Sequence, residues 1–267
     1  MLTIKNYVKA KSLSEAYELN QKRTNHILGG MLWMKMSNTN IQTAIDLSGL
    51  NLDTITETKE EFSIGCMVTL RQLELHPSLN EYTNFAISES VKSIVGVQFR
   101  NLATIGGSIF RRFGFSDVLT MFLALDTYVE LFHAGIVPLS EFVHMPLDND
   151  ILVRLIVKKV PLKTTYLSQR NTKTDFPVLA CSVSNIYGKY RAVIGARPAK
   201  AMLIEVPNDY LTGQTIEENA TLFSNYVAEQ TTTASNMRAS AEYRLHLAKV
   251  FAKRGFLQIQ QAGGKKK

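Results

Sequence analysis

Residues 100–108 read Arg-Asn-Leu-Ala-Thr-Ile-Gly-Gly-Ser, and the paired glycines in this stretch decide how the rest of the chain is interpreted. A second pair, Gly29-Gly30, follows a strand-like segment at 24–28 and precedes 31–36, where we expect one or two helical turns. Paired glycines let a backbone turn sharply and bring its N–H groups close to an anion without interference from a Cβ atom. Two such loops can hold a pyrophosphate between them. Tight turns remain the alternative, because neither pair lies in a Walker loop or a GxGxxG motif.

The composition is that of an ordinary globular protein with a sizeable core. Of the 267 residues, 45% are hydrophobic and 20% are charged, which excludes a disordered chain, a fibrous repeat and a disulfide-stapled miniprotein. The formal net charge of +7 includes the lysines at 265–267. The remaining balance does not indicate a nucleic-acid or membrane partner, and no alternation of basic and aromatic residues supports nucleic-acid binding. We therefore expect neither partner.

The cysteine count narrows the chemistry further. The chain has two cysteines, Cys66 and Cys181, far apart in the sequence, whereas an iron–sulfur cluster normally needs four thiolates and structural zinc needs four Cys or His ligands. The five histidines show no metal-ligand spacing, so we expect no metal site in this chain. Two reduced thiols, the lack of a signal-peptide pattern at the N-terminus and the lack of a long apolar run predict a cytoplasmic protein.

Hydrophobic periodicity and capping residues predict an α+β fold. Ser12 to Glu15 fits a capping box that starts a short helix, and Ser116 or Asp117 caps a helix that ends near Leu125. Further helices are expected from Thr69, over 82–95, over 216–229 and over 236–256, the last with a stripe of Ala239, Tyr243, Leu247 and Val250. Strands are expected at 44–47, 62–65, 128–132 and 151–160, followed by a hairpin of 178–185 and 190–196.

The surroundings of the second glycine pair resemble a known family. The stretch RNLATIGGS, an Asp nine residues beyond it (Asp117) and a helix ending Phe-Leu-Ala-Leu-Asp at 122–126 are similar to the FAD-binding (medium) subunit of molybdenum hydroxylases. This family includes the flavoproteins of xanthine dehydrogenase and carbon monoxide dehydrogenase and carries a PCMH-type FAD domain. The stretch ILGGMLWMKM from Ile27 resembles the other FAD loop of the family, and MRASAEYRLHLAKVFAKR from Met237 resembles its closing helix.

The resemblance implies a domain organisation. A PCMH-type FAD-binding domain is expected over 1–161, with two α/β subdomains at about 1–52 and 53–161. A small C-terminal flavoprotein domain with an antiparallel sheet and helices is expected over 162–260, and a flexible tail over 261–267. Pro161, which lies between a strand and a polar stretch, is the best boundary candidate from the sequence itself.

The resemblance also implies a set of cofactor-binding residues. Backbone groups of the first loop would surround the FAD pyrophosphate, the second loop would close its other side, Asp117 would accept hydrogen bonds from ribityl hydroxyls, and Leu155 would form part of an apolar wall. The two loops comprise Leu28, Gly29, Gly30, Met31, Leu32 and Trp33, and Thr104, Ile105, Gly106, Gly107 and Ser108.

The function implied by the resemblance is electron transfer in a larger enzyme. Electrons would pass from iron–sulfur clusters on a partner subunit through FAD to an acceptor such as NAD, with the molybdopterin on a further subunit and no catalytic residue on this chain. The low cysteine count agrees with the clusters lying on another subunit. The alternative is a self-sufficient FAD oxidoreductase similar to the enolpyruvyl-sugar reductases, which would need its own acid and base residues.

The chain departs from the family pattern at three places. Met31 replaces a hydroxyl-bearing residue that many relatives carry after the first glycine pair, so only its backbone N–H can meet a phosphate. Arg111 and Arg112 stand where small residues are common, and either could meet the cofactor or an acidic partner. Ser168 stands where a lysine near the flavin is common, with Arg170 nearby, which leaves the tuning of the flavin and the identity of the acceptor open.

Overall fold

The computed structural model of the chain describes residues 1–261, so the predicted tail, apart from Gln261, lies outside the described residues. The chain forms two compact units that alternate along the sequence. The first unit comprises Met1–Gln72, Val97–Arg111 and Thr127–Lys158. The second comprises Leu73–Gly96, Arg112–Asp126 and the described part of the chain from Lys159 onward.

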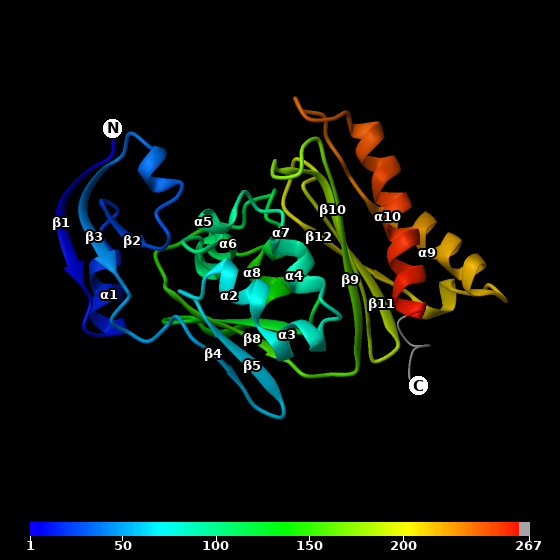
Figure 1. Cartoon of the computed structure of the whole chain (residues 1–267), viewed down its shortest axis with the longest axis horizontal. Coiled ribbons are helices and arrows are strands. Elements are labelled where there is room, and N and C mark those ends of the chain that lie inside the picture. Colours follow the sequence, from blue (N-terminus) through cyan, green and yellow to red (C-terminus); the bar gives the residue numbers. More distant parts are fainter. Residues whose placement is uncertain (262–267) are drawn as a thin grey trace. The chain divides into compact units, whose positions relative to one another are not determined.

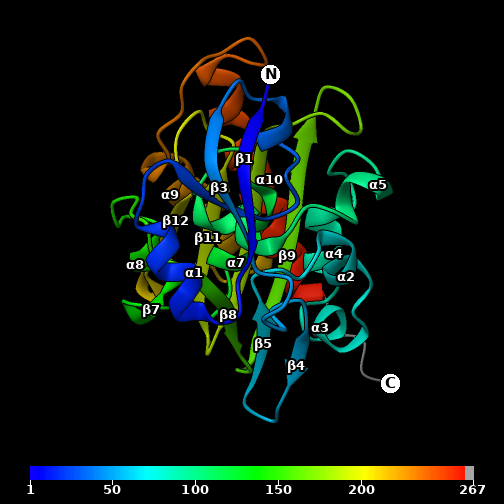
Figure 2. The same cartoon turned by 90° about the vertical axis from the view of Figure 1, so that its left-hand side faces the viewer.

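The N-terminal part of the first unit is a three-stranded parallel sheet with the order β1-β3-β2 (Figures 1 and 2). Its elements are β1 (Thr3–Lys9), α1 (Leu13–Asn20), β2 (Asn25–Leu28), the short 3-10 helix η1 (Met34–Met36) and β3 (Asn40–Asp46). The helix α1 begins where predicted, because the side chain of Ser12 accepts a hydrogen bond from the Glu15 amide at 3.1 Å. This helix packs on β2 and β3.

The remainder of the first unit is built on a five-stranded antiparallel sheet with the order β4-β5-β8-β6-β7. Its strands are β4 (Ile55–Glu57), β5 (Glu61–Gly65), β6 (Thr127–Leu131), β7 (Gly135–Pro138) and β8 (Leu152–Lys158). The helices of this part are α5 (Val97–Arg100), α6 (Ile105–Phe110) and α8 (Leu139–Phe142), and α2 (Leu70–Leu75) crosses into the second unit. The helix α6 packs on β8, which brings the second glycine pair onto this sheet.

The second unit is built on a four-stranded antiparallel sheet with the order β12-β11-β10-β9. Its strands are β9 (Leu162–Arg170), β10 (Pro177–Ile186), β11 (Lys189–Gly195) and β12 (Met202–Val206). Its helices are α3 (Pro77–Tyr82), α4 (Ala86–Val91), α7 (Asp117–Leu123), the 3-10 helix η2 (Asn208–Tyr210), α9 (Ile216–Gln230) and α10 (Ala241–Gln261). The α+β class and the antiparallel C-terminal sheet are therefore confirmed.

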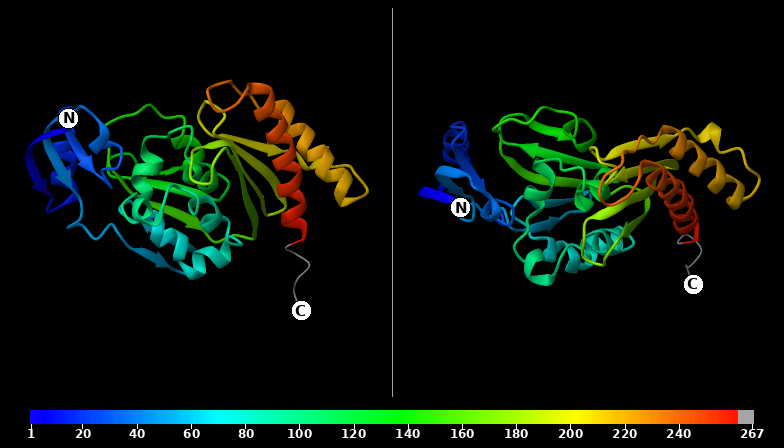
Figure 3. Two further views of the ribbon diagram at one scale, coloured as in Figure 1. Left: turned by 45° about the horizontal axis from the view of Figure 1, so that its top comes forward. Right: turned by 90° about the horizontal axis from the view of Figure 1, so that it is seen from above.

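Helices cover both faces of this sheet. Because successive side chains of a strand point to opposite faces, one strand can contact the helices on both sides. The hydroxyl of Ser184 on β10 donates to the Ala124 carbonyl just after α7 at 2.6 Å, whereas its neighbour Val183 contacts Gly255 of α10. Successive side chains of β10 therefore point to opposite faces. Figure 3 shows α9 and α10 side by side along the sheet. The predicted hairpin of β10 and β11 is confirmed, with its turn at Tyr187-Gly188.

The single helix predicted over 82–95 is wrong, because the chain breaks into α3 and α4. Asn84 and Phe85 both adopt the left-handed conformation, with φ of 50° and 62°. The buried amide of Asn80 stabilises this break, since its Nδ2 donates to the Leu73 carbonyl at 2.9 Å and its Oδ1 accepts from the Ser88 amide at 2.9 Å. A side chain that bonds the backbone on both sides of a turn replaces the missing helical hydrogen bonds.

The last helix begins at Ala241 rather than at 236, and its buried face differs from the predicted stripe. Tyr243 is exposed, whereas Arg244 is only 1% exposed. The guanidinium of Arg244 donates to the carbonyl groups of Val178, Ala234 and Ala239 and to Oδ1 of Asn236, at 2.6–2.8 Å. These bonds hold 234–239 in a non-helical turn, which explains the late start of α10.

Candidate functional site

The two glycine pairs, 76 residues apart in the sequence, meet in the first unit. A Cβ atom on Gly30 would lie 1.9 Å from the Leu102 carbonyl oxygen, and one on Gly29 would lie 3.1 Å from Oγ1 of Thr104. Real Cβ atoms do not approach a backbone oxygen this closely, so no side chain fits at residue 30 while the two segments touch. The structure thus brings 28–33 and 104–108 together, as a shared site requires.

The first segment offers hydrogen-bond donors that the protein does not use. Leu28 ends β2, and the chain then passes through Gly29, Gly30, Met31 and Leu32 before η1. Within residues 1–261, the amide groups of Gly30, Met31 and Leu32 have no acceptor. Buried or half-buried amides are nearly always paired, so three consecutive unpaired N–H groups indicate a place for an external acceptor.

Met31 gives this segment its shape. Its φ of 57° lies in the left-handed region, which costs a side-chain-bearing residue about 1–2 kcal/mol. Two contacts hold it there: its carbonyl accepts from the Lys35 amide at 2.9 Å, and its side chain packs on the small core of Leu28, Ile41 and Ala44. Backbone strain of this kind concentrates at sites that clamp a ligand.

The second glycine pair lies in the first turn of α6, not in an open loop as predicted. Thr104 caps this helix by accepting from the Gly107 amide at 3.2 Å. The amides of Ile105 and Gly106 donate to the carbonyls of Val68 and Cys66 at 2.8 and 2.9 Å, and that of Ser108 donates to Thr104 at 3.1 Å. These four amides are therefore satisfied within the protein. Gly106 is required for packing, because a Cβ there would lie 2.7 Å from the Cys66 carbonyl oxygen.

Leu155 and Asp117 occupy very different surroundings. Leu155 lies on β8 between Ile64 of β5 and Val129 of β6, and its side chain is fully covered by the chain itself. Asp117 belongs to the second unit, where it is the first residue of α7, and Ser116 is the residue that caps this helix. The predicted cap is confirmed.

Asp117 is the centre of a buried cluster that the sequence did not predict. Its Oδ1 accepts a short hydrogen bond from the Tyr166 hydroxyl and lies 2.7 Å from Nη2 of Arg170. The side chains of Asp117 and Arg170 are 5% and 8% exposed. Burial raises the pKa of the Asp117 carboxyl above its usual value, while Arg170 and then Tyr166 act in the opposite direction. Tyr166 and Arg170 stand four residues apart on one strand face, a period-two pattern that could have suggested a shared partner.

The residues at which the chain departs from the family pattern are separated. Arg111 is exposed at the end of α6 in the first unit, whereas Arg112 is buried in the second unit. Ser168 lies on β9, paired in register with Ala180. Trp33 is 48% exposed at the start of η1.

The described part of the chain holds no cluster of three or more His, Cys, Asp or Glu side chains that could bind a metal ion. Cys66 and Cys181 are free and buried, and burial raises the pKa of each thiol to about 12. Among residues 1–261, no helix combines the length and apolar character needed to cross a membrane.

Both halves of the chain match sequence profiles of oxidoreductase flavoproteins. Residues 2–162 match the FAD binding domain in molybdopterin dehydrogenase, and residues 165–259 match the CO dehydrogenase flavoprotein C-terminal domain. The first match covers more than half of the 267 residues, so the chain belongs to the family of molybdopterin dehydrogenase FAD-binding domains. FAD is accordingly its cofactor, and the free amides of 30–32 fit the phosphate groups of that molecule.

Relatives extend over nearly the whole chain. The uncharacterized protein YgfM of Escherichia coli strain K12 is 24% identical over 271 residues, which covers 97% of this chain and 98% of that protein. Quinoline 2-oxidoreductase from Pseudomonas putida 86 has the same fold, with a TM-score of 0.85 and 20% identity over 98% of both chains. Carbon monoxide dehydrogenase from Hydrogenophaga pseudoflava gives 0.84 and 22%, over 96% of this chain and 97% of its own. At these identities the structural likeness establishes the fold.

Proposed function

We propose that the chain is the FAD-carrying electron-transfer subunit of a molybdenum hydroxylase. In this role it takes electrons from iron–sulfur clusters on a partner subunit and delivers them to an acceptor such as NAD. FAD supplies the redox chemistry, because its ring system accepts and releases electrons, and the protein contributes binding, orientation and electrostatics.

The observation that carries this proposal is the set of unpaired amides at Gly30, Met31 and Leu32 beside the second glycine segment. In the proposal these three N–H groups donate to the pyrophosphate oxygens, with Leu28, Gly29 and Trp33 bordering the same site. Fixed backbone donors bind phosphate without the entropic cost of ordering long side chains. The loss of a hydroxyl side chain at Met31 is tolerated because the donor is its backbone.

The second segment has a different role in the proposal. The amides of Ile105, Gly106, Gly107 and Ser108 are already engaged, so this segment contributes a fixed surface rather than donors. Thr104 lies against Gly29, and Gly107 is exposed, so these residues close the other side of the pyrophosphate. Leu155 lies on β8, the strand on which α6 packs.

The proposed partners follow from the absence of a metal-binding cluster among residues 1–261. The two thiols are buried and held protonated, so neither is disposed to ligate iron, and the described residues hold no other cluster of metal ligands. We therefore assign the iron–sulfur clusters and the molybdopterin to two partner subunits of one complex, in the cytoplasm.

Purification of the tagged chain from its native host tests the proposal. The expected result is a complex with one FAD per copy of this chain together with stoichiometric iron and molybdenum, measured by absorbance and elemental analysis. Isolation of the chain alone, with steady NADPH-dependent reduction of a small substrate, would overturn the proposal in favour of a self-sufficient flavin oxidoreductase.

A further inference from the structure

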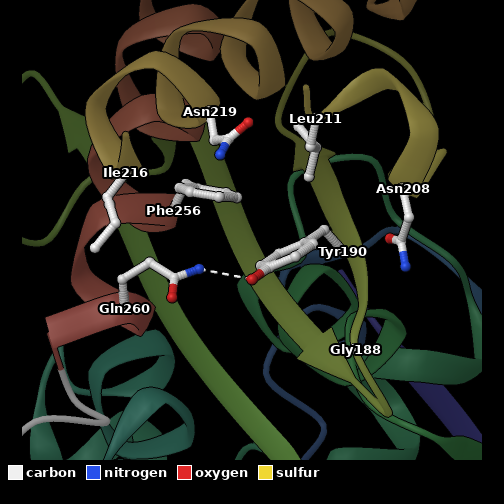
Figure 4. Close-up of a pocket in the computed structure, with 8 residues that line it drawn as sticks. All are labelled: Gly188, Tyr190, Asn208, Leu211, Ile216, Asn219, Phe256 and Gln260. Atoms are coloured by element: carbon white, nitrogen blue, oxygen red, sulfur yellow. Dashed lines mark hydrogen bonds between the residues drawn. The ribbon is translucent and has the colours of Figure 1, made fainter. Parts of the chain in front are cut away.

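A pocket in the second unit has no role in the proposed function (Figure 4). It lies where the β10–β11 turn, η2, α9 and α10 meet, and its volume is about 290 Å³. A cavity of roughly 150 Å³ can hold a benzene ring, so this pocket has room for one six-membered ring with its substituents. Every lining residue belongs to the second unit, and the pocket is therefore complete within that unit.

The apolar part of the lining suits a flat ring. Phe256 is buried and forms a ring pair with Tyr190, with the two ring centres 4.9 Å apart. Leu211 and the exposed Ile216 add aliphatic surface. Gly188 leaves one side open, because no heavy atom lies within 4 Å of the place where its Cβ atom would stand. An aromatic and aliphatic lining of this kind favours contact with an aromatic ligand.

Two polar groups of the pocket are free to meet a ligand. Nε2 of Gln260 donates to the Tyr190 hydroxyl oxygen at 2.7 Å, the bond drawn as a dashed line in Figure 4. This bond leaves the O–H proton of Tyr190 without an acceptor and Oε1 of Gln260 without a donor among the described residues. Asn219, in contrast, is fully engaged, since its side-chain amide exchanges two 2.9 Å bonds with the Gly213 backbone. The pocket thus presents one donor and one acceptor next to each other.

The lining also defines the charge of the ligand. None of the lining side chains is charged, so an ionic ligand would lose hydration without gaining an opposite charge. An adjacent donor and acceptor are complementary to the edge of a lactam, where a C=O group stands beside an N–H group. The C=O group would accept from the Tyr190 hydroxyl, and the N–H group would donate to Oε1 of Gln260.

We propose that this pocket binds an uncharged heteroaromatic lactam, a ring of the pyridone or pyrimidinone type. Phe256 contacts the ring, and Tyr190 and Gln260 recognise its lactam edge. The inference goes beyond the proposed function and does not depend on it, because none of these residues belongs to the two glycine segments that carry the FAD proposal.

Titration of the purified full chain with 2-pyridone, in the presence of one equivalent of FAD and followed by saturation-transfer NMR of the ligand, tests this inference. We expect saturable binding of one 2-pyridone per chain. N-methyl-2-pyridone keeps the ring and the carbonyl but has no N–H group, so it should bind at least about tenfold more weakly, because Oε1 of Gln260 is then left unpaired. Benzoate, an anion of similar size, should not bind.

Variants of the two polar residues complete the test. Tyr190→Phe removes the donor and should lose about tenfold in affinity. Gln260→Met removes the acceptor, so it should bind the two pyridones about equally, a change that altered packing alone would not produce. Tyr226→Phe removes a hydroxyl of the same unit outside the pocket and should bind as wild type.

Three results would overturn the inference. These are no saturable binding of 2-pyridone, equal binding of the two pyridones by wild type, and wild-type affinity in Tyr190→Phe. Melting temperatures of the variants, measured in parallel, show that each is folded. Each of the three results leaves the proposed function standing, because FAD binding is assigned to other residues.

Discussion

Gly30 of the first glycine pair packs directly against the backbone of Leu102, in the segment that leads to the second pair. A Cβ atom on residue 30 would lie 1.9 Å from the Leu102 carbonyl oxygen. This contact joins the segment with free amide donors to the segment that shapes the site. The amide of residue 30 is itself one of those donors. The close contact between the two segments and the row of unpaired amide donors therefore both depend on residue 30.

Gly30→Ala should force the two loops apart. We expect a loss of about 3 kcal/mol in the free energy of unfolding, because the added methyl meets backbone rather than a mobile side chain, and at least a tenfold loss of FAD affinity. Gly213→Ala is the control, since a Cβ there would also meet close neighbours, Glu218 Cβ at 2.6 Å and the Asn219 amide nitrogen at 2.9 Å, but at a position outside the proposed FAD site. Thermal unfolding and FAD titration measure both effects, and an equal loss of FAD affinity in the two variants would contradict the account.

Val95→Asn should stabilise the protein. Val95 adopts a φ of 48° while half exposed, and a β-branched side chain is poorly suited to this left-handed conformation. Asparagine tolerates it, so we expect a gain of about 1 kcal/mol in unfolding free energy. Ile136→Asn, an exposed position on β7, should give no gain. A lower melting temperature for Val95→Asn than for wild type would show that the strain is not relieved.

Arg244→Met should destabilise the second unit. The substitution leaves the buried carbonyl of Val178 without its side-chain donor and removes one of the two donors to the Ala239 carbonyl, which also accepts from the Asn236 amide. An unsatisfied buried carbonyl costs about 1–3 kcal/mol, and the bonds to Ala234 and Asn236 are lost as well. We expect a total loss of about 3 kcal/mol or more, seen as a lower melting temperature. Arg254→Met, on the exposed side of α10, should change stability by less than about 0.5 kcal/mol. Similar melting temperatures for the two variants would refute the structural role of Arg244.

Cys66 and Cys181 should be unreactive in the folded protein. Burial raises the pKa of each thiol to about 12, so almost no thiolate exists at pH 8.5, where about half of a free cysteine is ionised. We expect alkylation by iodoacetamide to be more than about a hundredfold slower than in urea. The folded pKa values lie above the unfolded ones, so the associated stability is complete below about pH 8 and declines as the pH rises toward 12. Equal alkylation rates in buffer and in urea would contradict this.

Local patterns were enough to predict much of the fold. The Ser12 and Ser116 caps, the hairpin of β10 and β11 and the α9 helix depend on residues close together in the sequence, and the structure confirms each. The contact of the two glycine segments agrees with the expectation that they share a site. Such features follow from capping and periodicity because their hydrogen bonds close over a few residues.

The remaining features depend on partners distant in the sequence. Arg244 looks like a surface residue of an amphipathic helix, yet one of its acceptors is the carbonyl of Val178, 66 positions earlier. In the sequence, the amides of residues 105 and 106 could be taken as donors for a ligand, but in the structure they donate to the carbonyls of Val68 and Cys66. Tyr166 and Arg170 become informative only when β9 places them against Asp117. Local sequence patterns do not indicate which distant carbonyls will accept these hydrogen bonds. The sequence therefore could not predict that the first loop has free amide donors whereas the amides of the second are already paired.

The central claim is that this chain binds FAD through the amides of 30–32, and titration of the purified apo chain tests it most directly. The account predicts saturable binding of one FAD per chain, with quenching of flavin fluorescence, and a loss of at least tenfold in affinity for Gly30→Ala but not for Gly213→Ala. No affinity for added FAD, or unchanged affinity in Gly30→Ala, would contradict it.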